Sequence, residues 1–238
     1  MEMDKVLVFD IWGDYGHFRK IETTTSPLTY SIPTITSLNG LIAAIMGLQR
    51  DSYYELFSPQ TIRYGIKIQA PVKRINININ LINTSDGFFL WDIKDTSSSP
   101  TPFEFLKSPH YRIYVWLGNE DLYLKLKDSL ISHKSVFTPC LGLSELIANF
   151  RFIGEFKPEI REGVEDHVDT AIKKDDFKIE VDKIEAGMRL AMESIPFYMD
   201  SNRRVLDYKR VLLEQNGRPL KVEEGIIYKV GEDKVAFL

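Results

Sequence analysis

Apolar and polar residues alternate in several short stretches of the chain, and such alternation predicts β-strands with one buried face. Residues 5–11 are β-branched and apolar enough for a central strand, and residues 62–69 alternate with basic side chains on the outer face. Residues 110–117 alternate between an apolar face and a face of aromatic and cationic side chains. Residues 149–156 give a further strand.

Two other stretches show the spacing of helices. Between Ile35 and Leu48 the apolar residues recur at helical intervals, which predicts one buried helix face. Thr34 stands where a hydroxyl can cap the first backbone N–H groups, and Gly47 stands where a helix often ends in a left-handed residue. Residues 120–132 place leucines at i, i+4 and i+8 and acidic residues in the first turn, which predicts an amphipathic helix.

A long β-hairpin is predicted over residues 72–94, between the second and third of these strands. Its first strand has one apolar face and one face lined with polar side chains, which are Arg74, Asn76, Asn78 and Asn80. An Asp-Gly turn signal at residues 86 and 87 precedes FFLWD, which predicts the returning strand. A loop rich in Ser, Pro and Thr, from Asp95 to Pro102, is expected to close the hairpin.

The last third of the chain has a different pattern. Residues 158–183 are strongly charged without a clear period, and this favours a mobile, solvated connection or insertion. From Ile195 onward the segments VLDYKRVLL, GIIYKV and KVAFL favour strands, so a small antiparallel β region is expected. We therefore divide the chain into residues 1–157 and residues 158–238.

Without the hairpin, the predicted order is strand, helix, strand, strand, helix, strand. This βαββαβ order is the ferredoxin-like order of RNA-recognition modules. The predicted fold class is therefore α+β, with a ferredoxin-like (RRM-like) palm, an inserted hairpin and a small β-rich C-terminal region. Because this fold hosts many functions, the order alone names none of them.

The composition restricts the chemistry that the chain can carry. Cys140 is the single cysteine and the four histidines are scattered, so no disulfide, metal site or cofactor is expected. No apolar run reaches the length of a membrane span, and the N-terminus does not resemble a signal peptide, so we expect a cytoplasmic protein. The net charge is −4, but residues 18–80 carry +4, which makes the N-terminal part the better face for a polyanion.

The best candidate for an anion-binding site lies between residues 18 and 48. It combines two basic side chains with small hydroxyl donors, and the set is Arg19, Lys20, Thr23, Thr24, Thr25 and Ser26. The predicted helix would point its N-terminus toward this loop, where the helix dipole favours an anion. A capped core helix after an irregular surface loop explains the same residues without a ligand, and both interpretations stay open.

Two further stretches carry groups that contact nucleic acid in other proteins. The aromatic and cationic face of residues 110–117, which includes Arg112, has the groups that base stacking uses if the face is open. A second layer of protein packed on that face is the alternative. In the loop TPCLGLSE, Gly142 and Ser144 could present a backbone N–H group and a hydroxyl to a phosphate.

These stretches together resemble a known family. FR followed by TTTSPLTYSIPTITSLNGLIAAIMGL resembles the N-terminal signature of the CRISPR-associated "Cas five" family, a branch of the repeat-associated mysterious protein (RAMP) superfamily. SPHYRIYVWL is similar to that family's strand after its inserted hairpin, and TPCLGLSE is similar to its Pro-x-Leu-Gly loop. The resemblance covers most of residues 5–156 and, more loosely, the tail that begins IPFYMD.

The resemblance implies a ferredoxin-like palm with a β-hairpin thumb at about residues 72–106. It also implies a non-catalytic, RNA-binding subunit of a type I Cascade surveillance complex, which defends against foreign DNA. In that family the subunit holds the 5′ handle of the CRISPR RNA and caps one end of the backbone filament. The implied partners are CRISPR RNA, the backbone subunit (Cas seven family) and the large subunit (Cas eight family), with target DNA reached only through the complex.

The resemblance also implies which residues contact the RNA. Those placed along the handle are Arg19, Lys20, Thr23, Thr24, Thr25, Ser26 and Tyr30. Asn39 and the mid-helix glycine Gly40 are placed where the helix approaches the handle. The remaining predicted contacts are Arg74, Asn76, Asn78, Arg112, Gly142 and Ser144. Leu143 departs from the family, because members often carry a basic residue there.

Two other functions compete with this interpretation. One subtype of the family cuts precursor CRISPR RNA without a metal, using a tyrosine, a lysine and a histidine, and the possible substitutes here are Tyr30, His17, Lys73 and His110. Acid/base catalysis needs these side chains within hydrogen-bond reach, which spacing alone does not show. An unrelated α+β enzyme for a small metabolite is the third hypothesis, although the chain has no metal motif and no phosphate-binding glycine fingerprint.

Overall fold

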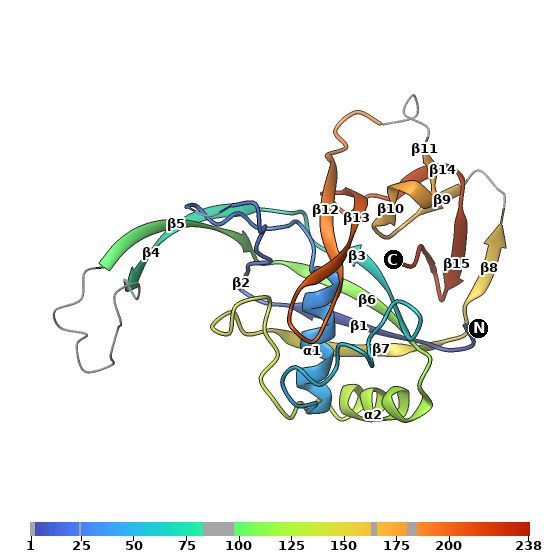
Figure 1. Ribbon diagram of the computed structural model, residues 1–238. Helices are drawn as coiled ribbons and strands as arrows, with labels where there is room; N and C mark the ends of the chain where they lie inside the picture. Colours follow the sequence, from blue (N-terminus) through green and yellow to red (C-terminus); the bar gives the residue numbers. More distant parts are fainter. Residues whose placement is uncertain (1–2, 24, 83–97, 163–165, 180–184) are drawn as a thin grey trace.

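The computed structural model describes residues 3–23, 25–82, 98–162, 166–179 and 185–238. Over these residues the fold consists of antiparallel sheets and two α-helices, so the predicted α+β class is confirmed (Figure 1). Neither helix in this part of the chain is long and apolar enough to cross a membrane.

A four-stranded antiparallel sheet forms the centre of the molecule (Figure 1). Its strands are β1 (Val6–Trp12), β3 (Ile62–Ile68), β6 (His110–Leu117) and β7 (Asn149–Phe156). They lie in the order β3-β6-β1-β7, and each neighbouring pair is antiparallel. The four strands predicted from the alternation are therefore confirmed, with nearly the same bounds.

Both predicted helices are also present. Helix α1 spans Ile35–Met46, and the hydroxyl of Thr34 caps it by accepting a hydrogen bond from the backbone N–H of Ser37 at 3.1 Å. It ends at Gly47, whose φ of 71° is left-handed, as the sequence predicts. Helix α2 spans Glu120–Ile131 and carries its acidic residues in the first turn.

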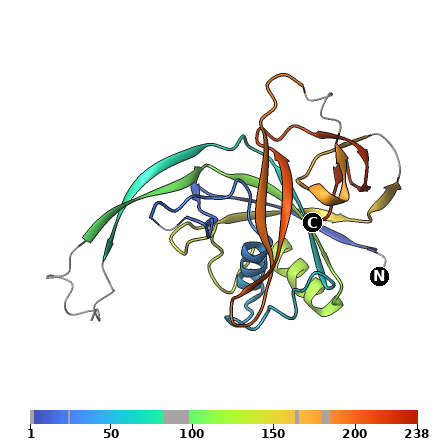
Figure 2. The same cartoon turned by 45° about the horizontal axis from the view of Figure 1, so that its top comes forward.

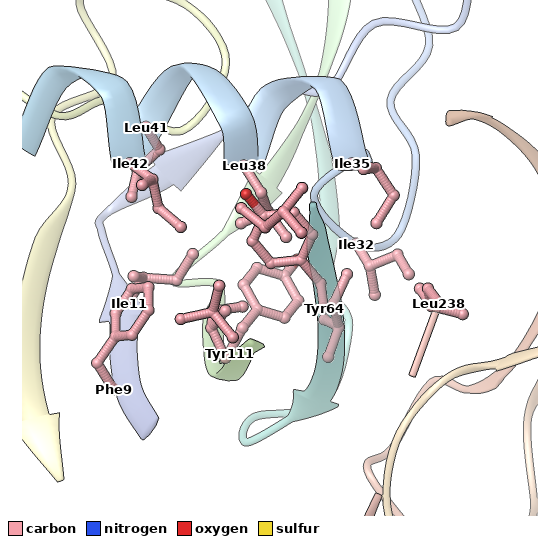
Figure 3. Close-up of a cluster of buried hydrophobic side chains, with 14 of the residues drawn as sticks. Phe9, Ile11, Ile32, Ile35, Leu38, Leu41, Ile42, Tyr64, Tyr111 and Leu238 are labelled. Carbon is pink, nitrogen blue, oxygen red and sulfur yellow. The ribbon is translucent and has the colours of Figure 1, made fainter. Parts of the chain in front are cut away.

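The two helices cover one face of the sheet and build the main core with it. Figure 3 shows the apolar side of α1 pointing at side chains from β1, β3 and β6. The residues that meet there are Ile35, Leu38, Leu41 and Ile42 of the helix and Phe9, Ile11, Tyr64 and Tyr111 of the strands. Full burial of each large apolar side chain stabilises the fold by roughly 1.5–3 kcal/mol, so this layer fixes where the loops at the ends of α1 lie.

The predicted hairpin projects from the body of the molecule (Figure 1, Figure 2). Strand β4 (Arg74–Ile82) pairs with β5 (Ser98–Lys107), and the register runs from Arg74 opposite Leu106 to Ile82 opposite Ser98. The short strand β2 (Tyr15–Gly16) pairs with the base of β5.

The second half of the hairpin differs from the sequence-based expectation. The predicted Asp-Gly turn and the FFLWD strand lie outside the described residues. The predicted loop from Asp95 to Pro102 is wrong for Ser98 to Pro102, because these residues belong to β5. Their Ser, Pro and Thr content is typical of a loop, but pairing with β4 overrides this local preference.

The predicted mobile connection over residues 158–183 is also wrong for the residues that the structure describes. They form short strands and a 3₁₀ turn: β8 (Glu159–Glu162), β9 (Asp166–Val168), β10 (Ile172–Lys173), η2 (Lys174–Asp176) and β11 (Lys178–Ile179). Their partners lie far along the chain: β13 (Val205–Glu214), β14 (Leu220–Glu224) and β15 (Ile226–Val230). Such short segments carry no period of their own, so their structure depends on these later strands.

The predicted β-rich C-terminal region is present and covers two surfaces. Strand β12 (Leu190–Met199) forms a long hairpin with β13 and packs on α1. Strands β15 and β16 (Asp233–Val235) pack on the face of the central sheet that the helices leave free. The covered aromatic side chains of β6 are Tyr114 and Trp116, which are 0% and 3% exposed. A protein layer therefore occupies this part of the face, which rules out base stacking on these two rings.

The predicted division at residues 157 and 158 stays a prediction. Side chains from both parts nevertheless share one hydrophobic cluster. The members from the C-terminal part are Ala171, Ile195, Phe197, Val211, Leu213 and Leu238. The core beneath α1 is therefore completed by residues that lie far along the chain.

Candidate nucleic-acid interface

The loop before α1 folds back on itself beside the base of the hairpin. Lys20 N–H donates to the carbonyl of Leu28 at 2.8 Å, and the hydroxyl of Thr23 closes the turn by accepting from Leu28 N–H at 3.1 Å. Strand β5 holds the far side of the loop, because Glu104 N–H donates to the carbonyl of Pro27 at 3.0 Å. The described residues of the loop 18–33 are thus folded back on themselves, and we call this segment the strap. Of its predicted hydroxyl donors, Thr25 and Ser26 are exposed, and Thr24 lies outside the described residues.

A buried carboxylate neutralises two of the predicted RNA-binding cations. Glu193, on β12, has a side chain that is 5% exposed and lies 3.3 Å from the ammonium of Lys20 and 3.6 Å from the guanidinium of Arg74. It also accepts hydrogen bonds from the backbone N–H and the hydroxyl of Ser31, both at 2.9 Å. Sequence reasoning missed Glu193, since nothing in the pattern of β12 indicates a partner more than 100 residues earlier.

A second carboxylate ties Arg74 to the strap. Glu104 lies 3.5 Å from the Arg74 guanidinium and accepts a hydrogen bond from the backbone N–H of Thr29 at 3.1 Å. Arg74 also donates to the hydroxyl of Ser31 at 2.6 Å. Lys20 and Arg74 therefore hold the strap, the hairpin and β12 together, and their charges are already compensated.

Three other cations near the base of the hairpin are exposed and have no ion pair within the described residues. The guanidinium of Arg19 reaches only the carbonyl of Thr23, at 3.5 Å. Lys73 and Lys107 face each other at the start of the ladder, where Lys107 N–H donates to the Lys73 carbonyl at 2.9 Å. Like charges directly opposite each other in a sheet are unfavourable, and an anion between them relieves the repulsion.

The polar face of β4 is also exposed, and it is the face opposite to the one that carries Phe103, Phe105 and Lys107. Asn76 and Asn78 are exposed and point to the same side of the strand as Arg74, as predicted. The opposite face of the hairpin is apolar. The centroid of the His17 ring lies 5.6 Å from the ring centroids of Phe103 and of Phe105. The hairpin therefore has one side that can donate hydrogen bonds and one side that anchors it to the body.

Two residues predicted to contact RNA are buried and hydrogen-bonded within the protein. The hydroxyl of Tyr30 donates to the carbonyl of Ser194 at 2.8 Å, and burial raises the pKa of Tyr30. Asn39 accepts a hydrogen bond from the hydroxyl of Tyr64 at 2.8 Å. Both side chains are buried and their polar atoms already have partners inside the protein, so they are not among the contacts proposed below.

The N-terminus of α1 is buried as well. Thr34 is 3% exposed, and its hydroxyl already accepts the backbone N–H of Ser37, so this N–H group is not available to the predicted anion. Gly40 lies on the outer side of α1, where an added Cβ would be 3.4 Å from the hydroxyl of Tyr53. Gly40 is half-buried beside Tyr53, and its placement at the RNA stays a prediction.

Arg112 lies on the other face of the sheet, in a network of ion pairs. Its guanidinium is 2.8 Å from Asp10, which is 1% exposed, and 3.5 Å from Asp233. Burial raises the pKa of Asp10, but the hydrogen bonds from Arg112 and Arg151 outweigh this effect and hold the pKa below its usual value. Arg112 is thus compensated by carboxylates of the protein.

In the loop TPCLGLSE (residues 138–145), called the glycine loop below, one of the two predicted RNA contacts packs against the protein itself. Gly142 has a φ of 99°, and an added Cβ would collide with the backbone carbonyl of His17. The backbone N–H of His17 in turn donates to the carbonyl of Leu141 at 2.9 Å. Ser144 is exposed, and its hydroxyl donates to Glu145 at 3.1 Å.

The four residues of the catalytic alternative are not joined by hydrogen bonds within the described residues. His17 is 1% exposed and bonds through Nδ1 to the carbonyl of Glu104 at 2.7 Å, and burial lowers the pKa of His17. His110 lies 3.7 Å from Asp10 on the other face of the sheet, and Lys73 is exposed. Tyr30 bonds to a backbone carbonyl, so no acid/base pair is formed among these side chains.

The fold is an α+β arrangement of antiparallel sheets and two helices, and exposed cations lie at the base of its hairpin. The family model described as "CRISPR-associated protein (Cas_Cas5)" matches residues 6–218, and the chain belongs to this family. The resemblance predicted from the sequence is thereby confirmed. Among curated proteins, none matches the chain.

Solved structures with the same fold are distant in sequence. A chain of a structure named "CRISPR RNA-guided surveillance complex" has 13% identity and a TM-score of 0.55, over 91% of each chain. A CRISPR protein from Archaeoglobus fulgidus has 13% identity and a TM-score of 0.56, over 97% of each chain. A chain of a Type III-B Cmr-beta complex bound to cognate target RNA and AMPPnP has 11% identity and a TM-score of 0.50, over 91% of this chain and 86% of the other.

Proposed function

We propose that the chain is a non-catalytic subunit of a type I CRISPR surveillance complex that binds the 5′ handle of CRISPR RNA and caps the backbone filament. The observation that carries the proposal is the group of exposed, uncompensated cations at the base of the hairpin: Arg19, Lys73 and Lys107. Membership of the family and the fold shared with a chain of an RNA-guided surveillance complex support it.

In this proposal the sheet β3-β6-β1-β7 with α1 and α2 is the ferredoxin-like palm, and the hairpin of β4 and β5 is the thumb. The order of strands and helices along the chain supports this assignment, as does the position of the hairpin between β3 and β6. The thumb projects from the palm (Figure 2).

The proposed RNA contacts divide into two kinds. Arg19, Lys73 and Lys107 bind phosphates, because their charges are exposed and have no carboxylate partner among the described residues. The amides of Asn76 and Asn78 hydrogen-bond to bases and sugars along the thumb. Thr25, Ser26 and Ser144 add hydroxyl donors. Lys20 and Arg74 act indirectly by holding the strap in place through Glu193.

The same assignment sets the proposed partners. A subunit that holds the 5′ end of a guide RNA must lie at one end of the assembly, beside the first backbone subunit (Cas seven family). The large subunit (Cas eight family) is its proposed neighbour on the other side, and target DNA meets this chain only through the complex. The proposed place of action is the cytoplasm, and the proposed contacts require no cofactor.

The test is the salt dependence of binding to handle RNA. The variant Arg19→Ala/Lys73→Ala should bind more weakly, and the slope of log affinity against log salt should fall by about 1.4, since each phosphate contact on a single strand contributes roughly 0.7. Arg161→Ala/Arg204→Ala is the matched control, because it removes the same charge from exposed sites elsewhere. Equal affinity and slope in the first variant and the unsubstituted chain would refute the site.

The endoribonuclease alternative can be tested with the same reagents. Precursor repeat RNA incubated with the protein in EDTA should stay intact, because the four candidate side chains form no hydrogen-bonded pair. A discrete cut that Tyr30→Phe abolishes would instead establish the enzyme.

A further inference from the structure

A second site lies on the opposite side of the molecule from the strap. It is a cavity of about 360 Å³ between the edge strand β3, the segment that carries η2, and strand β15. The residues that matter below are Arg63, Lys173, Phe177, Ile226, Tyr228 and Phe237. Cavities of this size and larger are typical of small-molecule sites.

Aromatic side chains line the floor of this cavity. Phe177 and Phe237 are 7% and 8% exposed, and Tyr228 meets Phe237 edge-to-face with ring centroids 5.3 Å apart. Gly225 has a φ of 149°, and an added Cβ would collide with the Phe177 ring, so a glycine is needed to bring the backbone against that ring. The two nearly buried phenylalanine rings form a fixed support, and the half-buried Tyr228 is the ring with the most surface open to a ligand.

The two cations that line the cavity, Lys173 and Arg63, differ in whether a carboxylate compensates their charge. The ammonium of Lys173 lies 2.7 Å from Asp176, so these two charges compensate each other. Arg63 is exposed and has no ion pair within the described residues, and its guanidinium lies 5.8 Å from the centre of the buried Trp116 ring. This contact restrains the guanidinium at the mouth of the cavity, where its charge is left for a ligand.

We propose that this cavity binds one nucleotide, with the base against the aromatic floor and the phosphate at Arg63. An inorganic anion would use Arg63 but leave the aromatic surface empty, and an apolar molecule would leave the cation unpaired. A nucleotide matches both features, since it joins a flat π-system to a phosphate. The nucleotide is either free or the end of a single strand, and both offer the same chemistry.

The experiment is a titration of the full chain with the four ribonucleoside monophosphates, followed by calorimetry or ligand-observed NMR. Arg63→Ala should weaken binding about tenfold, the loss expected for one charge-assisted hydrogen-bonding group. Ile226→Glu should weaken it as well, because it places a carboxylate on the rim at a residue that is 52% exposed. Arg204→Ala is the matched control and should bind like the unsubstituted chain.

A second arm uses short single-stranded RNA and DNA, with Arg19→Ala/Lys73→Ala as the background so that the thumb does not contribute. Binding of mononucleotides identifies the free ligand, and binding of the oligonucleotides alone identifies a strand end. No saturable binding of any probe at millimolar concentration would overturn the proposal. So would equal affinity for inorganic phosphate or for the nucleoside without phosphate. Because this site is separate from the thumb, either result leaves the proposed function untouched.

Discussion

At the scale of single residues, Glu193 determines which basic side chains near the thumb are free. Its carboxylate is almost fully buried between Lys20 and Arg74, and the backbone N–H of Ser31 completes its hydrogen bonds. Burial of a lone carboxylate is unfavourable, so loss of either Lys20 or Arg74 would destabilise the buried charge of Glu193. Lys20 of the strap and Arg74 of β4 therefore contribute to cohesion between the strap, the hairpin and β12.

Glu193→Gln should lower the free energy of unfolding by about 1–3 kcal/mol, because the amide keeps the shape but removes the charge that compensates two cations. Urea unfolding followed by far-UV circular dichroism measures this difference. Glu22→Gln, at an exposed position in the same strap, is the control and should change stability by less than about 0.5 kcal/mol. If both variants unfold alike, the Glu193 charge contributes nothing to cohesion.

At the scale of elements, the glycine loop packs against the backbone of His17, directly before the strap, and this close approach requires a glycine. Gly142 combines a left-handed φ with a position against the His17 carbonyl, whereas Gly187 has a left-handed φ of 84° but no atom closer than 3.8 Å to an added Cβ. A side chain at Gly187 would therefore meet only backbone strain, whereas a side chain at Gly142 would meet both backbone strain and a steric collision. The strap can lie beside the thumb only if the loop at Gly142 has no side chain.

Gly142→Ala should destabilise the protein by about 1–3 kcal/mol more than Gly187→Ala, because only the first variant adds a collision to the strain of a positive φ. Equilibrium unfolding of the two variants under the same conditions gives the comparison. Equal destabilisation would show that the loop can move away from the strap at no measurable cost.

At the scale of the whole molecule, the C-terminal strands cover surfaces of the central sheet and of α1. Val235 and Phe237 cover the sheet face that carries Tyr114 and Trp116, and β12 packs on α1. Each of these surfaces is apolar and would be open without residues beyond 157. The hydrophobic core of residues 1–157 therefore continues into the C-terminal strands.

Residues 1–157 expressed alone should not unfold cooperatively, because both faces of the sheet would expose large apolar side chains to water. Dye binding to exposed apolar surface, together with the dispersion of amide NMR signals, measures the state of the fragment against the full chain. A well-dispersed spectrum and a sharp thermal transition would show instead that the palm is an independent domain.

Local pattern was sufficient for the four strands of the central sheet, the two helices and the first strand of the hairpin. The bounds of α1 follow from Thr34, the apolar period and Gly47, because capping and amphipathicity depend on neighbouring residues. The polar face of β4 follows from alternation. The partners of Tyr30, Asn39 and Arg112 could not be predicted this way, since each depends on a residue brought near by folding.

The sequence by itself determined the α+β class of the fold, the family, the first strand of the hairpin, and the presence of cations both before α1 and at the start of that strand. Only the tertiary structure decided which of those cations are available. Lys20 and Arg74 are basic in the sequence just as Arg19 and Lys73 are, but Glu193 lies beside the first pair and not the second. The physical reason is that charge compensation acts over a few ångströms in space, and the chain brings Glu193 into that range only by folding.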